Sequence, residues 1–323
     1  MAVYTEVPDD ELASFVASYD IGTVTSCKGI AEGVENTNYM LTTTAGSYIL
    51  TLYEKRVARA DLPFFLGLME HLAANGITCP VPLRNRAGLM LSELAGRPAA
   101  LVTFLDGVWI RRPLERHCRA LGEALAKLHR AGADFALSRT NALSLPGWHI
   151  LGGKLGKDAN KVAPGLTRLI GDELSHLEGH WPQGLPAGVI HADLFPNNVF
   201  FLGERLSGLI DFYFACNDFL AYDLAVCLNA WCFDATGRLE PMKSRALLES
   251  YHAARPLTAE EVSALPVLAR GAALRFLLTR AYDWLHTADT ALVSRLDPNE
   301  YITKLRFHQE VRSAAQYGLG AAA

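Results

Sequence analysis

The sequence predicts an α+β protein of two lobes, in which a small mixed α/β lobe is followed by a larger helical lobe. The chain has 323 residues and is 50% hydrophobic, which suffices for two domains with buried cores. Strand-like segments dominate its first third, whereas apolar residues at intervals of three and four dominate the rest. Strands followed by helices favour two lobes with a ligand-binding cleft between them.

Turn and helix signals in the sequence predict the secondary-structure elements of the first lobe. Strands are predicted over residues 23–30, 37–43, 47–53, 90–93 and 99–104. A helix is predicted over 61–74, because Pro63 suits a first helical turn and Asn75-Gly76 would end it. The predicted domains are therefore 1–105 as a nucleotide-binding lobe and 106–317 as a catalytic and acceptor-binding lobe.

The second lobe is expected to be mostly helical. Helices are predicted over residues 114–130, 165–177, 222–233, 243–253, 259–286 and 298–317. The segment 134–160 is rich in Gly and Ser, so we expect a partly mobile loop there. Residues 318–323 are expected to form a disordered tail.

Charge and cysteine usage exclude several classes of protein. The net charge of −4 offers no general attraction for nucleic acid or an anionic membrane. The 6 cysteines show no C-x-x-C spacing, which favours reduced thiols in a cytoplasmic protein. The N-terminus lacks the basic start and apolar stretch of a signal peptide, so we expect neither secretion nor a membrane partner.

One segment places acids and an amide around a predicted β-hairpin. It reads HADLFPNNVFFLGERLSGLIDF, and its two apolar runs flank a short turn with glycine. The hairpin would bring Asn198 near Asp211, with Asp193 on the loop that leads in. An amide and a carboxylate oxygen suit Mg²⁺ bound to nucleotide phosphates, and a second carboxylate can orient a hydroxyl. A single Asp would more often cap a turn, but this joint spacing predicts phosphoryl transfer.

The same residues resemble a known family. HADLFPNN followed by LIDF is similar to the catalytic loop and metal-binding motif of the aminoglycoside phosphotransferase and choline kinase group. The resemblance extends over about residues 20–235 through KGIAEGVENTNY, LVTFLDG, ALGEALAKLH and YDLA. It implies a bilobal protein-kinase-like fold with ATP bound between the lobes. Within the group, YILTLYE, VIHADLFPNNVFF, LIDFYFACNDFLAYDLAVCLNAWCFD and RGAALRFLLTRAYDWL are most similar to the homoserine kinases.

That resemblance implies an activity and roles for the loop residues. The implied reaction is the Mg²⁺-dependent phosphorylation of the L-homoserine side-chain hydroxyl by ATP, a step toward threonine. Asp193 would be the catalytic base or hydroxyl-orienting group, and Asn198 and Asp211 would hold Mg²⁺ against the ATP phosphates. His191 would pack the loop, and Asp223 would anchor it through backbone hydrogen bonds.

The resemblance also implies nucleotide contacts. Gly29 and Gly33 would let the backbone approach the phosphates, with Asn36 nearby. The hinge Thr103-Phe104-Leu105 would offer backbone groups to adenine. Protein kinases carry a Lys in the third strand paired with a helix Glu. Thr51 stands at that strand position here, and Phe65 stands near the position of the Glu. The basic residues that could contact phosphate instead are Lys28, Lys55, Arg56 and Arg59.

The acceptor pocket is predicted from chemical need. An amino-acid acceptor requires a cation or amide for its carboxylate. The candidates are Tyr213, Asn229, Arg275 and Arg280. Arg275 and Arg280 lie about 140° apart on a helix, so they would not grip one carboxylate together. Arg280 could instead pair with Asp283.

Two other functions remain open from the residues. One is a kinase of choline, ethanolamine, methylthioribose or an aminoglycoside. Choline would favour a cage of aromatic residues and acids, whereas homoserine needs a carboxylate clamp. The other is an ATP-binding module without turnover, which the combination of Asp193, Asn198 and Asp211 disfavours.

Overall fold

The chain divides into two compact units. The computed structural model describes residues 5–30, 36–54, 57–287 and 295–320. The first unit, here the sheet unit, comprises Met1–Asp106, Phe135–Leu137 and Gly208–Tyr213. The second, here the helical unit, comprises Gly107–Asp134, Ser138–Ser207 and Phe214–Ala323. The sequence placed 135–137 and 208–213 in the second lobe, but both segments group with the sheet unit.

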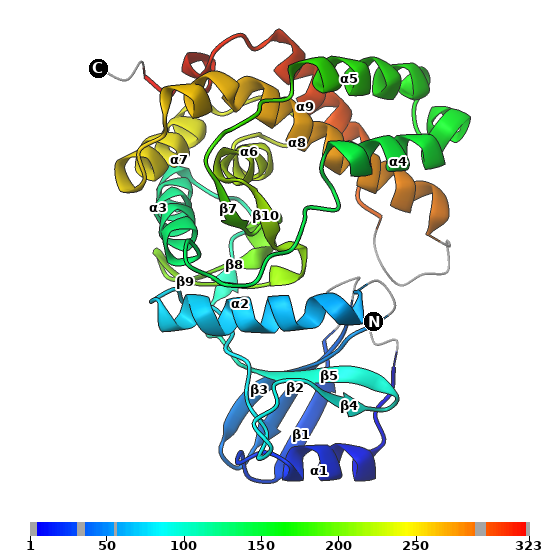
Figure 1. Ribbon diagram of the computed structural model, residues 1–323, viewed down its shortest axis with the longest axis vertical. Helices are drawn as coiled ribbons and strands as arrows, with labels where there is room; N and C mark the ends of the chain where they lie inside the picture. The colour runs from blue at the N-terminus through cyan, green and yellow to red at the C-terminus, as the bar shows by residue number, and fades with distance from the viewer. Residues whose placement is uncertain (1–4, 31–35, 55–56, 288–294, 321–323) are drawn as a thin grey trace. The chain divides into compact units, whose positions relative to one another are not determined.

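An antiparallel sheet forms the body of the sheet unit (Figure 1), with strand order β1-β2-β3-β5-β4. The strands are β1 (Val24–Gly29), β2 (Thr37–Thr43), β3 (Gly46–Leu52), β4 (Ser92–Leu94) and β5 (Arg97–Thr103). Helix α1 (Asp9–Ala17) packs on one face of the sheet, where Leu12 and Phe15 join a buried cluster with Leu41 and Leu50. We did not predict α1, although Pro8 and an acidic first turn signal its start.

The other helix of the sheet unit is α2 (Leu62–Ala74), which confirms the helix predicted there. A short 3-10 turn, Arg59–Asp61, leads into it. Pro63 stands in its first turn, and Asn75 ends it by bonding back to the last turn. Phe65 and Leu68 are among the fully buried side chains of this helix, and the ring of Phe64 packs against Phe135 of the same unit.

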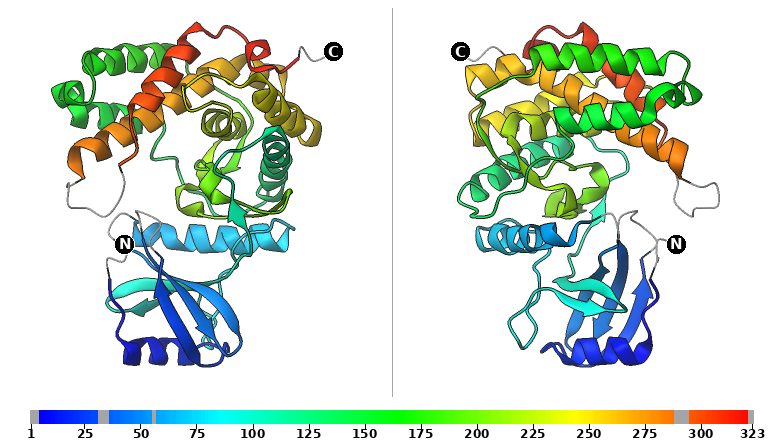
Figure 2. Two further views of the ribbon diagram at one scale, coloured as in Figure 1. Left: turned by 180° about the vertical axis from the view of Figure 1, so that it is seen from behind. Right: turned by 45° about the vertical axis from the view of Figure 1, so that its right-hand side comes forward.

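Seven helices of the described residues build the helical unit (Figures 1 and 2). They are α3 (Glu115–Ala131), α4 (Leu145–Leu155), α5 (Leu166–His180), α6 (Leu220–Trp231), α7 (Pro241–Ala254), α8 (Ala259–His286) and α9 (Asn299–Glu310). Helix α6 is buried along nearly its whole length, and Figure 1 shows it end-on among the other helices. It therefore forms the centre of this unit.

Short strands accompany these helices and frame the predicted catalytic loop. Strands β7 (Ala187–Ile190) and β10 (Cys216–Phe219) pair antiparallel. Strands β6 (Val108–Trp109), β8 (Val199–Leu202) and β9 (Arg205–Leu209) form a sheet in the order β6-β8-β9. The predicted hairpin is β8–β9, and its turn uses Gly203 at a φ of 62°. The catalytic loop thus runs from the end of β7 to the start of β8.

Helix α8 is the long apolar helix of the fold. By length and composition it could cross a membrane, but 61% of its most apolar window is buried inside the protein. Arg275 and Arg280 lie on it and are themselves buried. Charged residues in buried positions paired within the protein are typical of a core helix, which is how we interpret α8.

The expected loop over 134–160 was wrong. Helix α4 lies within it, followed by a 3-10 turn over Gly156–Lys161. Trp148 anchors α4: it is fully buried, and its ring packs edge-on against Trp181 with centroids 5.0 Å apart. A Cβ on Gly147 would lie 2.0 Å from the carbonyl oxygen of Ala142. Glycine at this position permits a close backbone approach, so it does not mark a flexible loop.

Two expectations near the C-terminus also fail. The helix predicted over 298–317 is interrupted, because α9 ends at Glu310, Val311 turns extended, and a 3-10 helix follows over Ala314–Tyr317. Val311 is buried, which favours the break. Of the tail expected to be disordered, Leu319 is buried and held by a backbone bond to Ala314, whereas 321–323 lie outside the described residues.

We expect opposite effects from Ala at two helical glycines. A Cβ on Gly122 of α3 would lie 2.4 Å from the Leu247 carbonyl oxygen of α7, so Gly122→Ala forces these helices apart. Overpacking of this kind costs about 1–3 kcal/mol of unfolding free energy. Gly171 of α5 meets nothing within 4 Å, and Gly171→Ala should add about 0.5–1 kcal/mol through helix propensity. Urea unfolding measures both, and equal shifts would contradict the close packing of α3 and α7.

Candidate active site

The loop between β7 and β8 carries Asp193 and is held through its own backbone. The carboxylate of Asp223, on α6, accepts the amide of His191 at 2.7 Å and that of Ala192 at 2.8 Å. These are the backbone hydrogen bonds that the resemblance implies for Asp223. On the far side of Asp193, the indole of Trp231 donates to the Leu194 carbonyl at 2.7 Å. Helix α6 therefore fixes the loop before and after Asp193.

Asp223 remains ionised although it is fully buried. Burial raises the pKa of its carboxyl, but the hydrogen bond and charge of His129 and the amide of His191 outweigh it, so its pKa lies below the usual value. His129 of α3 lies 3.1 Å from this carboxylate through Nε2 and 2.7 Å from the hydroxyl of Tyr251 through Nδ1. A polar chain thus links α3, α6 and α7 behind the loop.

Asp193 itself is half-buried and contacts Asn198. The amide nitrogen of Asn198 donates to the Asp193 carbonyl at 2.8 Å and approaches its carboxylate at 3.2 Å. With Nδ2 used in this way, Oδ1 of Asn198 is the atom with acceptor capacity for another ligand, although Asn197 also donates to it at 3.1 Å. His191 is buried and accepts the Asp193 amide at 3.3 Å, which fits its predicted role in packing the loop.

Asp211 follows strand β9 in the sheet unit. Its φ of 65° lies in the left-handed region, which is uncommon for a residue with a side chain. Leu209, two residues earlier, donates its amide to Thr78 at 3.0 Å and ties this segment to the sheet unit. Strained backbone of this kind clusters at functional sites, and Asp tolerates it better than most residues. A carboxylate oxygen is also a ligand type that Mg²⁺ prefers.

Hydroxyl groups occupy the neighbourhood of Thr51, where kinases carry a lysine. Thr51 is buried and donates to Oδ1 of Asn38 at 2.8 Å. The hydroxyls of Tyr53 and Tyr213 lie 3.2 Å apart, and burial raises the pKa of Tyr213 to about 12. Phe65, near the position of the kinase glutamate, packs edge-on against Tyr213 with centroids 5.7 Å apart. A neutral network therefore occupies this position, and Tyr213 belongs to it.

The predicted nucleotide-binding residues of the sheet unit are placed as follows. Gly29 ends β1, Asn36 is buried and accepts the Glu54 amide at 3.4 Å, and Gly33 lies outside the described residues. At the hinge, Thr103 pairs with Val81 through backbone and side chain. Phe104 is exposed, and Leu105 is partly buried. The nucleotide contacts of all these residues stay predictions.

Two of the four basic candidates for phosphate contact, Lys28 and Arg59, lie within the described residues. Lys28 is exposed on β1. Arg59 pairs with Glu93 at 2.8 Å on the surface. Lys55 and Arg56 lie outside the described residues.

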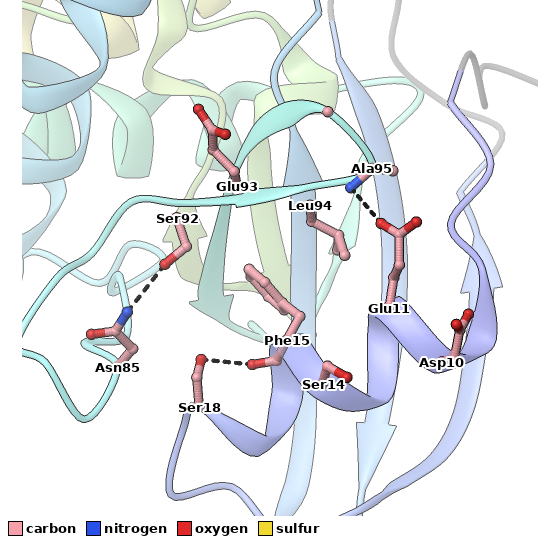
Figure 3. A pocket seen from close by; sticks show the side chains of 11 residues that line it. Asp10, Glu11, Ser14, Phe15, Ser18, Asn85, Ser92, Glu93, Leu94 and Ala95 are labelled. Atoms are coloured by element: carbon pink, nitrogen blue, oxygen red, sulfur yellow. Dashed lines mark hydrogen bonds between the residues drawn. The ribbon is translucent and has the colours of Figure 1, made fainter.

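A pocket of about 570 Å³ opens in the sheet unit, and Glu93, the ion-pair partner of Arg59, is one of its lining residues. Figure 3 shows that it lies between α1 and the β4–β5 turn. Its polar groups bond to one another: Glu11 accepts the Ala95 amide at 3.1 Å, and Asn85 donates to Ser92 at 3.1 Å. None of the predicted site residues lines it.

Of the predicted acceptor residues, Asn229 is enclosed by protein partners. Its side-chain amide donates to the carbonyls of Ala225 and Ala269 at 3.0 Å each, and its Oδ1 lies 3.0 Å from Nε2 of His308. Nδ1 of His308 lies 2.7 Å from the hydroxyl of Tyr317. Asn229 thus ties α6 to α8 and α9.

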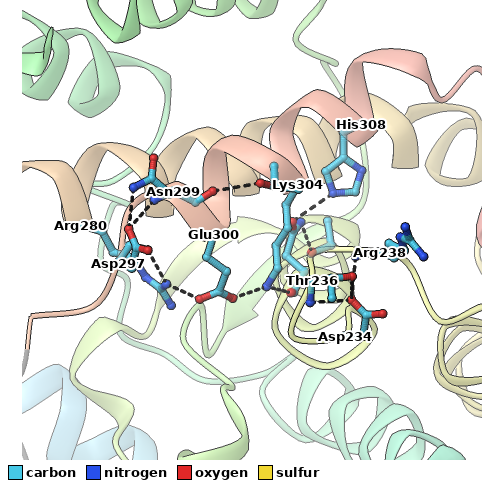
Figure 4. Close-up of polar contacts among 12 residues, drawn as sticks. Asp234, Thr236, Arg238, Arg280, Asp297, Asn299, Glu300, Lys304 and His308 are labelled. Carbon is cyan, nitrogen blue, oxygen red and sulfur yellow. Dashed lines mark hydrogen bonds and ion pairs between the residues drawn. The ribbon is translucent and has the colours of Figure 1, made fainter. Parts of the chain in front are cut away.

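Arg280 belongs to an ion cluster on α8 and α9 (Figure 4). Its guanidinium donates to Glu300 at 2.6 Å, and Lys304 donates to the other oxygen of the same carboxylate at 2.6 Å. The two cationic side chains are only 9% and 4% exposed, whereas Glu300 is 44% exposed. Burial opposes the charge on Glu300, but Lys304 and Arg280 hold its pKa below the usual value. A carboxylate that pairs with Arg280 is therefore Glu300.

Several of these partners were missed at the sequence level. Glu300 and Lys304 are spaced i, i+4 on α9, which is a recognisable ion-pair signal. Trp231 lies in a stretch singled out by the resemblance, but its bond to Leu194 joins positions far apart in the sequence. No local pattern predicts a contact of that kind.

His308 should make the protein sensitive to mild acid. Burial and the charge of Lys304 lower the pKa of His308 to about 3, against about 6.5 when unfolded. Between these values the unfolded state binds a proton that the folded state does not, so unfolding free energy falls by about 2 kcal/mol from pH 6.5 to 5. His308→Gln should flatten this slope in urea titrations. His149→Gln, on the exposed side of α4, is the control, and a slope unchanged by His308→Gln would refute the assignment.

Known phosphotransferases are similar to this chain over most of its length. Residues 26–257 match the family model described as the phosphotransferase enzyme family. A homoserine kinase of Sinorhizobium fredii is 63% identical over 99% of this chain and 98% of its own length. One of Xanthobacter autotrophicus is 64% identical over 99% of this chain and 100% of its own length.

Solved structures of low identity share the fold. A spectinomycin phosphotransferase superposes with a TM-score of 0.69 at 14% identity, covering 96% of this chain and 97% of the other. A choline/ethanolamine kinase family protein from Mesorhizobium loti gives 0.64 at 18% identity, covering 96% and 99%. The sheet unit and the helical unit thus have the architecture of the aminoglycoside phosphotransferase and choline kinase group. The chain belongs to the phosphotransferase enzyme family.

Proposed function

We propose that the protein is a homoserine kinase, which transfers the γ-phosphate of ATP to the side-chain hydroxyl of L-homoserine and releases O-phospho-L-homoserine and ADP. The observation that carries this proposal is the 63–64% identity to curated homoserine kinases over 99% of the chain. The identity covers the helical unit that carries Asp193 as well as the sheet unit. The product is an intermediate of threonine biosynthesis, and a cytoplasmic location is part of the proposal.

Asp193 is the residue we assign to the acceptor hydroxyl. Its carboxylate is half-buried, and Asn198 and the backbone restrain it. A carboxylate held in this way accepts the hydroxyl proton as the oxygen attacks the γ-phosphorus and the bond to ADP breaks.

Asn198 and Asp211 are the residues we assign to Mg²⁺. Both offer oxygen donors, an amide Oδ1 and a carboxylate, which are the donor types that Mg²⁺ prefers over nitrogen or sulfur. When bound, the ion neutralises negative charge on the nucleotide phosphates. In the sheet unit, Gly29, Asn36, Thr51 and the hinge 103–105 are the residues we assign to ATP.

Arg280 is the residue we assign to the acceptor carboxylate. Its Nε is buried without a hydrogen-bond partner among the described residues, while Nη1 binds Glu300. Arg280, Glu300 and Lys304 together carry one excess positive charge. The carboxylate of an amino acid would offset that charge, and its ammonium would complement the partly exposed carboxylate of Glu300.

Turnover across acceptors tests the proposed reaction. A coupled ADP-release assay with Mg²⁺ should rank homoserine above choline, ethanolamine, methylthioribose and kanamycin. Asp193→Asn should lower kcat by about 10²–10⁴-fold because it removes the proton acceptor, with little change in ATP affinity. Choline or kanamycin outrunning homoserine would refute the acceptor, and an unchanged kcat in the variant would remove Asp193 from the mechanism.

An acceptor without a carboxylate tests Arg280. Arg280→Gln should raise the KM for homoserine by about 10–100-fold, the cost of a lost hydrogen bond to a charged group. The KM for 3-amino-1-propanol, which has no carboxylate, should stay the same in this variant. Arg270→Gln on the same helix is the control, because Arg270 pairs with Glu173 at 2.6 Å. Equal changes for both acceptors would contradict the assignment.

A further inference from the structure

Arg275 of α8 is a buried cation that binds the catalytic loop. It is only 2% exposed, and its Nη1 donates to the carbonyl oxygen of Ala192. Its guanidinium carbon lies 4.5 Å from the ring centroid of Phe276 and 5.7 Å from that of Phe214. Within the described residues no carboxylate forms a direct ion pair with Arg275, and the charge of the half-buried Asp218 acts on it at longer range. A buried cation without a direct ion pair is costly, so core packing alone does not account for an arginine here.

The residue that Arg275 contacts has a strained backbone. Ala192 adopts a φ of 64°, in the left-handed region. For a residue with a Cβ this costs on the order of 1–2 kcal/mol and persists only where the surroundings enforce it. Asp223 binds the amide of Ala192, and Arg275 binds its carbonyl. The two charged residues therefore hold Ala192 from its two ends.

The orientation of this backbone bears directly on Asp193. The carbonyl that Arg275 binds belongs to the planar peptide between Ala192 and Asp193. If Ala192 relaxed to a negative φ, rotation about its N–Cα bond would move its carbonyl and the peptide that leads to the Asp193 side chain. Loss of Arg275 would also leave a buried carbonyl without a donor, which favours such a rotation.

We propose that Arg275 is a positioning residue for phosphoryl transfer. By holding the Ala192 carbonyl, it keeps the peptide before Asp193 in the orientation that directs the carboxylate toward the acceptor hydroxyl. It makes and breaks no bond in the reaction. The identity of the acceptor in this inference rests on the proposed function, whereas the effect of Arg275 on the loop does not.

A matched pair of variants separates positioning from stability. Arg275→Met keeps the apolar volume and removes the donor. Arg270→Met removes another largely buried arginine of α8, the one bonded to Glu173 at 2.6 Å. We expect Arg275→Met to lower kcat by about 100-fold, the scale of a misplaced catalytic group, with the KM for ATP unchanged within about twofold. Arg270→Met should lower the thermal midpoint but leave kcat near that of the wild type.

A second substitution at Ala192 distinguishes the two roles, because it should change kcat only if Arg275 positions the loop and not if Arg275 merely stabilises the fold. Glycine adopts the left-handed conformation without strain, so Ala192→Gly added to Arg275→Met should recover part of the lost kcat. Arg275→Lys keeps the charge and one donor and should fall between the wild type and Arg275→Met. If Arg275→Met fails to fold, Arg275→Lys with and without Ala192→Gly decides the question in the same way.

Hydrogen exchange tests the inference without the acceptor. Mass spectrometry of the peptide spanning residues 190–195 should show faster amide exchange in Arg275→Met than in Arg270→Met or the wild type. An unchanged exchange rate, or a kcat equal to that of Arg270→Met, would overturn the role of Arg275. Absence of homoserine turnover in the wild type would instead refute the proposed function, so the two failures are distinguishable.

Discussion

The conformation of the catalytic loop depends on one buried carboxylate that accepts two successive backbone amides. Asp223 has no exposure to solvent, and its charge is stabilised by those amides and by His129. Two neighbouring amides can point at one carboxylate only if the chain turns sharply, and the turn is taken up by the left-handed Ala192. The strain is therefore located next to Asp193 and is offset by helices packed behind it.

Helix α8 carries three arginines that contact different parts of the helical unit. Its arginines at 270, 275 and 280 are each five residues apart, so successive side chains point about 140° away from one another. They accordingly reach three different partners: Glu173 of α5, the Ala192 carbonyl and Glu300 of α9. One core helix thereby connects α5, the catalytic loop and α9.

Periodicity and motif spacing predicted most of the elements and the residues of the loop. Asp193, Asn198 and Asp211 are close in sequence, so their spacing carries the signal. Helix α4 was missed because a glycine such as Gly147 is typical of a loop in the sequence. In the structure this glycine instead allows the backbone to lie close to the Ala142 carbonyl. The target of Arg275 was missed because it lies 83 residues away in the sequence, and the hydrogen bond becomes visible only when the helix packs against the loop.

The neutral network around Thr51 has a chemical consequence. In protein kinases the strand lysine offers an amine beside the nucleotide phosphates. Here residue 51 is a buried hydroxyl bonded to Asn38, with the Tyr53–Tyr213 hydroxyl pair in the same unit. A nucleotide analogue that labels kinases by acylating the strand lysine meets no amine at this position. Covalent profiling that relies on acylation of the strand lysine would therefore not label residue 51 of this enzyme, even while nucleotide is bound.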